Sequence, residues 1–251
     1  LFRYFKQDFA QVTNPPIAPI REELVMELTT YIGPEGNLLG ETPEHCHRLE
    51  LEHPVLTNDE LEKIKQINQG VLKAKTFEIL FDPNKKHDMR HSLDKVCQLV
   101  ADSVRQGINL IILSDRGVTK DKAAIPSLLA VSGIHHYLIR SGLRTKTGLI
   151  LESGEPREVA HFALLCGYGA NAVNPYLAFD AINDSIRDGL FSEIPDYKTA
   201  QKNFIKAIGK GLFKVFSKMG ISTLQSYCGA QIFEAIGLDL ELISTYFTGS
   251  A

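Results

Sequence analysis

Several features are missing from this chain of 251 residues, and each absence excludes a class of protein. The chain has no tryptophan, and its four cysteines stand singly, without any Cys-x-x-Cys pair, which argues against a metal cluster and favours buried thiols in a reducing compartment. No apolar run approaches the roughly 20 residues of a membrane-spanning helix, and the opening residues lack the pattern of a signal peptide. The net charge is only −3, so neither nucleic acid nor an anionic membrane is expected as a partner.

The chain does contain a regular alternation of strand and helix patterns from residue 76 onward, with 44% hydrophobic residues overall. Strands separated by crossover helices imply a parallel sheet with right-handed connections. Five such units are too few to close an eight-stranded barrel. The predicted fold is therefore α/β, either an incomplete (β/α) barrel or an open parallel sheet flanked by helices. The expected strands are residues 76–81, 110–113, 148–152 and 170–173, with a fifth strand or extended piece at 221–227.

Residues 1–70 have a different character and are expected to form an irregular N-terminal arm ahead of an α/β domain at 71–251. An aromatic turn of helix is expected to stop before Pro15 and Pro16, because proline removes backbone donors and restricts the residue before it. Thr57 and Glu60 have the spacing of a capping box, which predicts a short amphipathic helix ending near Gly70. The chain begins at a leucine, so we expect it to be part of a longer protein.

The longest predicted helix spans about residues 198–219 and contains Gly209 and Gly211. Each interior glycine costs about 1 kcal/mol relative to alanine. The sequence therefore predicts close packing of another element against this helix at the glycines. A last pair of short helices is expected after Gly229.

Polar side chains follow the predicted strands, where parallel α/β folds bind ligands. Asp115, Arg116, Glu152 and Asn174 form a possible polar rim at the carboxyl ends of the strands. The alternative interpretation is that Ser, Asp and Asn residues at these ends cap the following helices. No Gly-x-Ser-x-Gly motif or glycine-rich dinucleotide loop is present, so no catalytic residue, cofactor-binding residue or metal ligand is assigned.

Several motifs in order along the chain resemble the central domain of glutamate synthase, a large flavin and iron–sulfur enzyme. The resemblance begins in the opening segment and continues across nearly the whole chain. The segments that carry it are QVTNPPIAPIREELVM at 11–26, ILSDR at 112–116, AIPSLLA at 124–130, HHYLIR at 135–140, SGEPRE at 153–158, GYGA at 167–170, NPYLA at 174–178, SKMGIS at 217–222 and GAQIFE at 229–234.

The resemblance implies a non-catalytic domain that links a glutaminase domain to a synthase domain carrying FMN and an iron–sulfur cluster. It implies no cofactor in this chain, the two other domains as partners within one polypeptide, and residence in the cytoplasm or plastid stroma. By resemblance, Thr13 and Asn14 are candidates for lining the passage that carries ammonia between the two active sites. The chain departs from the family pattern at Ala18, Ala160 and Cys228, where aspartate, histidine and arginine are usual.

Two other functions remain open on the sequence alone. One is a free-standing α/β enzyme with its active site at the strand-end rim, and the other is a separate binding subunit. The electron donor of the parent enzyme, whether ferredoxin, NADH or NADPH, is not indicated by any residue of this chain.

Overall fold

A five-stranded sheet forms the centre of the computed structural model, which describes residues 1–9, 13–37, 39–190 and 196–250. Four neighbouring strands run parallel, and the edge strand β4 pairs antiparallel with β5. The predicted α/β fold with a parallel, helix-flanked sheet is confirmed, and the described strands form no closed barrel. In spatial order the strands are β10 (Ala172–Asn174), β9 (Gly148–Glu152), β7 (Leu110–Ser114), β5 (Leu72–Glu78) and β4 (Asn68–Gln69).

Both faces of the sheet are buried, so its inner strands are apolar throughout rather than alternating. Every residue of β7 and β9 is buried. One face, which includes Ile111, Leu113 and Leu149, belongs to the main core with the helices. The other face, which includes Ile112 and Ile150, belongs to a smaller core.

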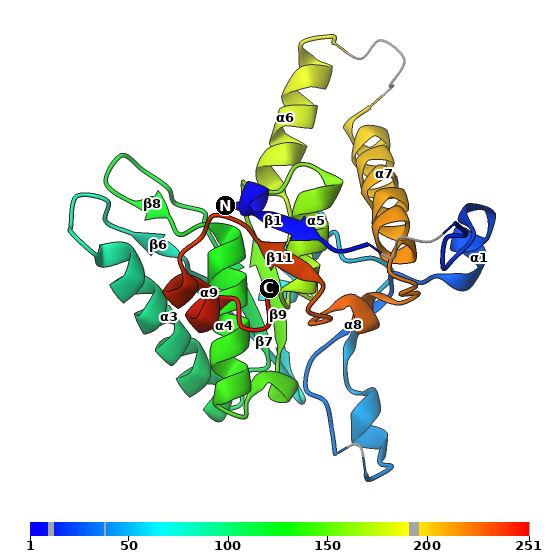
Figure 1. Cartoon of the computed structure of the whole chain (residues 1–251). Coiled ribbons are helices and arrows are strands. Elements are labelled where there is room, and N and C mark those ends of the chain that lie inside the picture. Colours follow the sequence, from blue (N-terminus) through cyan, green and yellow to red (C-terminus); the bar gives the residue numbers. More distant parts are fainter. Residues whose placement is uncertain (10–12, 38, 191–195, 251) are drawn as a thin grey trace.

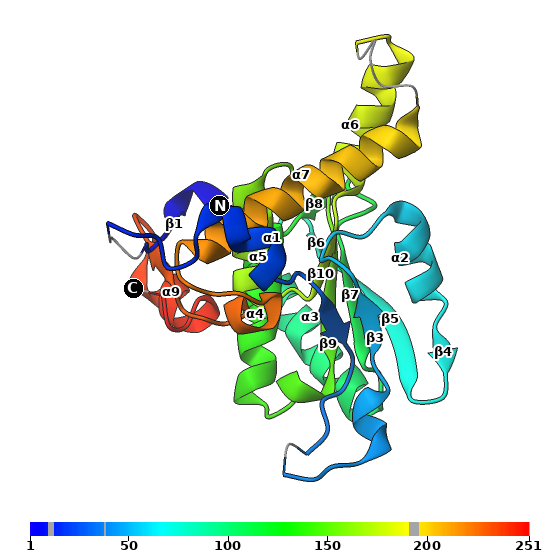
Figure 2. The ribbon, with the colours of Figure 1, turned by 90° about the vertical axis from the view of Figure 1, so that its right-hand side faces the viewer.

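Three helices of the βα units cover the first face: α3 (Asp88–Arg105), α4 (Ser127–Arg140) and α5 (Val159–Gly167). The second face is covered by α2 (Asn58–Lys65) and by the hairpin of β2 (Thr30–Ile32) and β3 (Leu49–Leu51). Figure 2 shows the sheet nearly edge-on, with α4 and α5 on one side and α2 on the other. The sheet is therefore sandwiched, with βα helices on one face and N-terminal segments on the other.

The capping box predicted at the start of α2 is confirmed. Thr57 Oγ1 accepts a hydrogen bond from the Glu60 amide at 3.2 Å, and a Glu60 carboxylate oxygen accepts one from the Thr57 amide at 2.8 Å. Leu61 and Ile64, on the apolar side of α2, are buried in the smaller core. A sequence-local signal thus places the helix that closes the second face.

The aromatic turn of helix expected at the start of the chain is present only at Phe2–Tyr4, and its predicted continuation through Phe5 is wrong. A single 3-10 turn, η1 (Phe2–Tyr4), leads into a strand, β1 (Phe5–Gln7), which pairs antiparallel with β11 (Phe233–Ala235). Phe5 is buried against Tyr168 and Phe247. The partner strand lies more than 220 positions away in the sequence, so local periodicity could not reveal it. A second turn, η2 (Pro19–Arg21), leads into the short α1 (Glu22–Val25).

The C-terminal part also departs from expectation in two places. Residues 224–227 form a short helix, α8 (Leu224–Tyr227), where a strand or extended piece was predicted, and only a single bridge joins Thr223 to Glu27. After Gly229, one of the two expected helices is the strand β11, followed by α9 (Leu240–Tyr246). Both segments are shaped by packing against distant residues.

The remaining helices project from the body. In Figure 1, α6 (Tyr176–Arg187) rises from the carboxyl end of β10, and α7 (Tyr197–Ser217) returns beside it. A small pair of strands, β6 (Leu80–Phe81) and β8 (Ala123–Ala124), lies over the top of the α3 side. The expected strand at 76–81 is therefore divided, since β5 ends at Glu78.

Gly211 shows the close packing that the sequence predicted for α7. A Cβ atom at this position would lie 2.2 Å from Val159 Cγ2 on α5. We expect Gly211→Ala to lower the free energy of unfolding by about 1–3 kcal/mol, because overpacking outweighs the gain of about 1 kcal/mol in helix propensity. Urea unfolding monitored by circular dichroism measures the change.

Gly209→Ala is the matched control. Its Cβ would meet only Leu28 Cδ1, the end of a side chain, at 3.3 Å. The Gly209 variant is expected to be at least about 1 kcal/mol more stable than the Gly211 variant. Equal stabilities for the two variants would show that α7 does not depend on close contact with α5.

Candidate functional site

The carboxyl ends of β7, β9 and β10 bring polar residues together around Glu152. The Glu152 side chain is 2% exposed and accepts three hydrogen bonds: from Ser114 Oγ at 2.7 Å, Arg116 Nε at 2.6 Å and Lys65 Nζ at 3.1 Å. Ser114 and Glu152 are the last residues of neighbouring strands, while Lys65 is the last residue of α2. We call these four residues the strand-end cluster.

The charges of the strand-end cluster compensate one another. Burial alone would raise the pKa of Glu152, but the hydrogen bonds from Ser114, Arg116 and Lys65 outweigh it and hold the pKa below its usual value. The Arg116 guanidinium also lies over the Tyr176 ring, 4.0 Å from its centroid. The carboxylate is thus an ionised, fully engaged acceptor, unlike a general base with a free lone pair.

Asp115 is held separately in the loop after β7. Its carboxylate accepts hydrogen bonds from Ser153 Oγ at 2.6 Å and from the Gly154 amide at 3.1 Å. Burial raises the pKa of Asp115, and the bonds from Ser153, Tyr176 and the Gly154 amide only partly offset that shift. Asp115 therefore fastens the β7 loop to the β9 loop.

Asn174 ends β10 and faces α2. Its Nδ2 donates to the Leu56 carbonyl and to Asn58 Oδ1, both at 2.9 Å. Its Oδ1 is buried and finds no partner among residues 1–9, 13–37, 39–190 and 196–250. Asn174 therefore links the end of β10 to the start of α2 through hydrogen bonds.

The helix-capping interpretation of the rim is wrong. The N-cap residues of α4, α5 and α6 make no side-chain capping hydrogen bond, and the Ser127 amide at the start of α4 donates instead to the Glu155 carboxylate at 2.8 Å. Loops separate α4 and α5 from the strands that precede them by several residues. At α6, the N-cap residue is Pro175, which has no hydroxyl or carboxylate. The polar side chains bond to one another across neighbouring loops instead.

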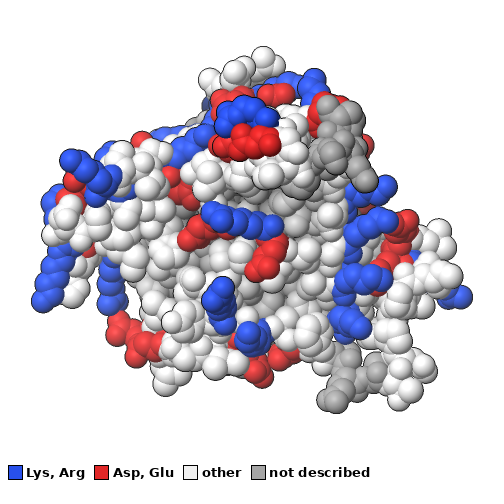
Figure 3. Space-filling view, turned by 90° about the horizontal axis from the view of Figure 1, so that it is seen from above, with Lys and Arg blue, Asp and Glu red and all other residues white. Residues whose placement is uncertain are grey.

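The pockets lie elsewhere on the molecule. None of five well-formed pockets on the described residues is lined by Asp115, Arg116, Glu152 or Asn174. Figure 3 looks down on the end from which α6 rises, and acidic and basic side chains lie close together there in several groups among uncharged residues. The structure brings the four rim residues to one end of the sheet but places no described pocket among them.

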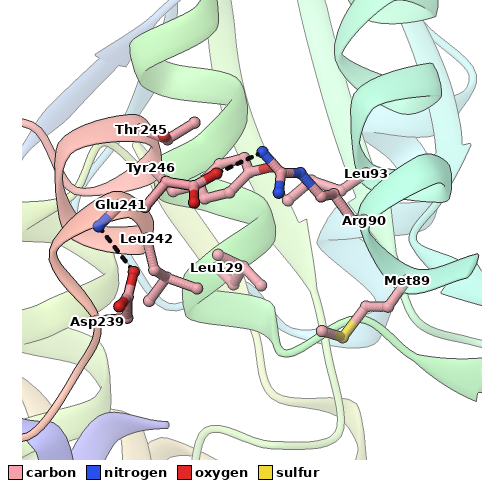
Figure 4. Close-up of a pocket in the computed structure, with 9 residues that line it drawn as sticks. All are labelled: Met89, Arg90, Leu93, Leu129, Asp239, Glu241, Leu242, Thr245 and Tyr246. Carbon is pink, nitrogen blue, oxygen red and sulfur yellow. Dashed lines mark hydrogen bonds and ion pairs between the residues drawn. The ribbon is translucent and has the colours of Figure 1, made fainter. Parts of the chain in front are cut away.

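One pocket is an apolar hollow between α3, α4 and α9, drawn in Figure 4. Leu93, Leu129 and Leu242 contribute apolar side chains to it, and Arg90 bridges to Glu241 at 2.9 Å across its edge. Both partners of this ion pair are well exposed, so the pair adds little stability. Of its polar lining residues, Arg90 is paired with Glu241, and Asp239 accepts a hydrogen bond from the Glu241 amide at the start of α9.

His135 lines two further pockets and is neutral. Its Nδ1 accepts a hydrogen bond from Arg144 Nε at 2.9 Å, and burial, with the nearby Arg144 charge, lowers the pKa of His135 to about 3. Arg144 also donates to the carbonyls of Thr147 and Gly169 at 2.7 and 2.9 Å. His135 helps hold an arginine that ties together the starts of β9 and β10.

Thr13 and Asn14 lie in the opening segment away from the strand-end cluster and are exposed. Pro15 and Pro16, which follow them, are exposed as well. The described residues place no other polar side chain in a hydrogen bond with Thr13 or Asn14. Their assignment to an ammonia passage stays a prediction.

The four cysteines are free thiols, of which Cys97 and Cys166 are buried. Burial raises the pKa of Cys97 to about 12 and that of Cys166 further. Within the described residues, no three His, Cys, Asp or Glu side chains gather where they could hold a metal ion. None of the described helices has the length and apolarity required to cross a bilayer.

Sequence reasoning missed Lys65 and Tyr176 as members of this region. Lys65 belongs to a helix that precedes the sheet in sequence, and nothing in its local pattern distinguishes it from the neighbouring Lys63. Tyr176 starts α6, and its partners Asp115 and Arg116 both come from the loop after β7. Only the folding of α2 against the sheet brings Lys65 to Glu152, 87 residues away.

Comparison with known structures agrees with the fold. The chain superimposes on an arginine-to-lysine mutant of flavocytochrome b2 with a TM-score of 0.51, covering 97% of this chain and 81% of that one. The sequence identity is 8%, so the likeness concerns the fold alone.

Comparison with known sequences is far more specific. The chain is 47% identical over 251 residues to the NADPH glutamate synthase large chain of Bacillus subtilis, covering 100% of this chain and 16% of the relative. It is 44% identical over 254 residues to the NADH glutamate synthase of Schizosaccharomyces pombe, covering 100% and 12%. The chloroplastic ferredoxin-dependent glutamate synthase of Spinacia oleracea is 42% identical over 262 residues, covering 100% and 16%.

This chain thus spans only about a sixth or less of the length of these relatives. The resemblance found in the sequence motifs is confirmed by a family match, since the family described as the glutamate synthase central domain covers residues 1–239. The chain belongs to the glutamate synthase central domain family.

Proposed function

We propose that this chain is the non-catalytic central domain of a glutamate synthase, an oxidoreductase of glutamate biosynthesis and nitrogen assimilation. In the whole enzyme, a glutaminase domain releases ammonia from glutamine, and a synthase domain carrying FMN and an iron–sulfur cluster combines it with 2-oxoglutarate. The central domain holds these two domains at a fixed separation and borders the ammonia passage. Both domains belong to the same polypeptide, and the parent enzyme resides in the cytoplasm or the plastid stroma.

The observation that supports a scaffold role most directly is the closed strand-end cluster. In an α/β enzyme, the carboxyl ends of the strands present groups toward a ligand. Here Glu152 has Ser114, Arg116 and Lys65 as partners, and Asp115 has Ser153 and the Gly154 amide. These side chains stabilise the loops that they join, which favours a rigid spacer over a free-standing enzyme.

The division into an arm at 1–70 and an α/β domain at 71–251 is part of the proposal. The opening part of the arm lies on the helix-covered side, where β1 pairs with β11 and α1 contacts α7. Its later part, from β2 to α2, covers the other face of the sheet. Because the arm contacts both faces of the sheet, it is suited to connect a preceding glutaminase domain firmly to the α/β domain.

The first test concerns the passage. In the whole enzyme, replacement of Thr13 and Asn14 by alanine is expected to uncouple the two reactions, because altering the wall of the passage lets ammonia escape to solvent. Free ammonia released per glutamine hydrolysed rises, while synthesis from added ammonia stays as in the parent enzyme. Parallel assays of glutamine, glutamate and ammonia measure this ratio.

Asn183→Ala is the matched control, because Asn183 is exposed on α6, away from the opening segment. Its ammonia release is expected to equal that of the parent. If the Thr13 and Asn14 variants also stayed fully coupled, the assignment of these residues to the passage would fall.

The second test concerns the rim. Arg116→Gln removes the most exposed charge of the strand-end cluster, whose side chain is 45% exposed. If the rim has only a scaffold role, the variant should have the same kcat as the parent enzyme at a temperature where both are folded. A loss of about a hundredfold or more, the size typical of removing a group that stabilises a transition state, would instead support an active site at the rim.

A further inference from the structure

Six lysines recur at every fourth position of the segment that forms α7. They are Lys198, Lys202, Lys206, Lys210, Lys214 and Lys218. Each step of four residues turns the direction of the side chain by roughly 40°, so only consecutive members share a face. Three consecutive lysines, Lys202, Lys206 and Lys210, span about 80° of the helix and lie along one side of it.

An open groove runs along this side of α7. Its apolar part is formed by Leu28, Ile205 and Phe213, and its edge by Lys202, Lys206 and Lys210. Gly209 lies between them, and its missing side chain leaves the helix surface notched at this point. We call this groove, with its lysines, the α7 groove.

The charge of the α7 groove is only partly compensated. Lys210 Nζ lies 3.4 Å from Glu23, and Lys214 Nζ lies 2.8 Å from Glu22 on α1. Lys202 and Lys206 form no ion pair with a carboxylate of the described residues. His53, which also lines the groove, has a buried Nδ1 without a hydrogen-bond partner in the described part of the chain.

Apolar side chains are exposed on the segment beside the groove. Ile20 is 93% exposed and Leu24 is 84% exposed. Both belong to the η2–α1 segment, which packs against α7 and supplies Glu23 to the groove. Figures 1 and 2 both show α1 beside the C-terminal half of α7. An apolar floor, two uncompensated lysines and adjoining exposed apolar side chains therefore occur on one side of the molecule.

We infer that the α7 groove binds an acidic, amphipathic segment from the remainder of the glutamate synthase polypeptide. The apolar side of that segment packs on Leu28, Ile205 and Phe213, and its carboxylates pair with Lys202 and Lys206. This inference rests on the proposed function, since it places the occupant in the part of the enzyme outside residues 1–251. About five-sixths of the Bacillus subtilis relative lies outside the region matched by this chain.

The composition of the groove favours a protein segment over other anionic partners. A nucleic acid would place phosphates along the lysines and would leave the apolar floor without a complementary surface. An anionic bilayer is disfavoured by Glu23, whose carboxylate lines the groove beside Lys210. Helix-in-groove recognition combines an apolar stripe with flanking charges, as the α7 groove requires.

The test uses the whole glutamate synthase and two lysine chemistries. Acetylation with a water-soluble active ester, followed by mass spectrometry, measures the reactivity of Lys202 and Lys206 against the exposed Lys63 and Lys120. We expect the groove lysines to be acetylated roughly tenfold more slowly. A tenfold difference corresponds to a contact whose closed state is more stable than its open state by about 1.4 kcal/mol. A carbodiimide then joins lysine amines directly to carboxylates in contact. The crosslinked peptides are expected to contain aspartate or glutamate from outside residues 1–251.

A charge-reversed pair provides the matched variants. Lys202→Glu with Lys206→Glu is expected to abolish the crosslinks and to raise the acetylation of Lys210 toward that of Lys63. Lys63→Glu with Lys120→Glu should change neither result. Groove lysines as reactive as Lys120 in the whole enzyme, or protection that disappears on nuclease treatment, would overturn the inference.

The two proposals fail separately. If the groove lysines are protected but the Thr13 and Asn14 variants remain coupled, the docking surface is retained and the passage assignment is rejected. If the lysines are unprotected but those variants uncouple the two reactions, the passage assignment is retained and the docking surface is rejected.

Discussion

Glu152→Ala is expected to lower the free energy of unfolding by about 3 kcal/mol or more, because breaking a buried ion pair leaves its partners uncompensated. The variant removes the acceptor of three hydrogen bonds, from Ser114, Arg116 and Lys65. Of these donors, Ser114 is buried and the Lys65 side chain is only 22% exposed. Urea unfolding of the variant and the parent chain at neutral pH measures the difference.

Glu62→Gln is the control, because Glu62 pairs with the same lysine at 2.7 Å but its side chain is 61% exposed. Exposed pairs contribute about 0–1 kcal/mol, so this variant should lose little stability. A Glu152 variant no less stable than the Glu62 variant would show that the strand-end cluster does not hold the loops together.

The contribution of Glu152 also has a definite pH dependence. Its pKa in the folded chain is lowered, so its stabilisation is complete above the ordinary glutamate value near 4.5 and is lost as pH falls through the lower folded value. Asp115 has the opposite sign, since its raised pKa means that protonation favours the folded state. The stability difference between the parent and Glu152→Gln isolates Glu152. It should shrink as the pH is lowered below about 4.5, and a difference that grew with acid would contradict the assignment.

Phe216→Ala is expected to cost about 3–5 kcal/mol of unfolding free energy, as for other buried phenylalanines. Phe216 is fully buried on α7 and stacks on Tyr227 of α8 with ring centroids 4.0 Å apart. The Tyr227 hydroxyl in turn donates to Gln7 on β1 at 2.7 Å. Loss of the ring therefore loosens α7, α8 and the N-terminal strand together. Phe216→Leu keeps most of the volume and should cost less, about 1.5 kcal/mol.

Phe9→Ala is the control for the same chemical change on the surface. Phe9 is 61% exposed, and a substitution there should stay within about 0.5 kcal/mol of the parent. Thermal and urea unfolding of the three variants give the comparison. Equal losses at Phe216 and Phe9 would contradict the role of the Phe216–Tyr227 stack.

The candidate site was predictable in its position but not in its chemistry. Parallel strands end at one edge, so Asp115, Glu152 and Asn174 could be assigned to a common end of the sheet from their place after strand patterns. Which of them pair, and with whom, depends on loops and on α2. The lysine spacing along α7 is visible in the sequence, yet only its packing beside α1 shows that the central lysines flank an apolar groove.

The sequence by itself determined the elements whose signals are local. The capping box at Thr57 and the apolar runs of β7 and β9 each depend on neighbours within a few residues or on the burial of one continuous stretch. The tertiary structure alone decided the state of residues 5–7 and 224–235. There, β1 pairs with β11 across more than 220 residues of chain, while α8 packs on α7, which is close to it in sequence. Short segments have weak intrinsic preferences, so the surface that buries them determines whether they become strand or helix.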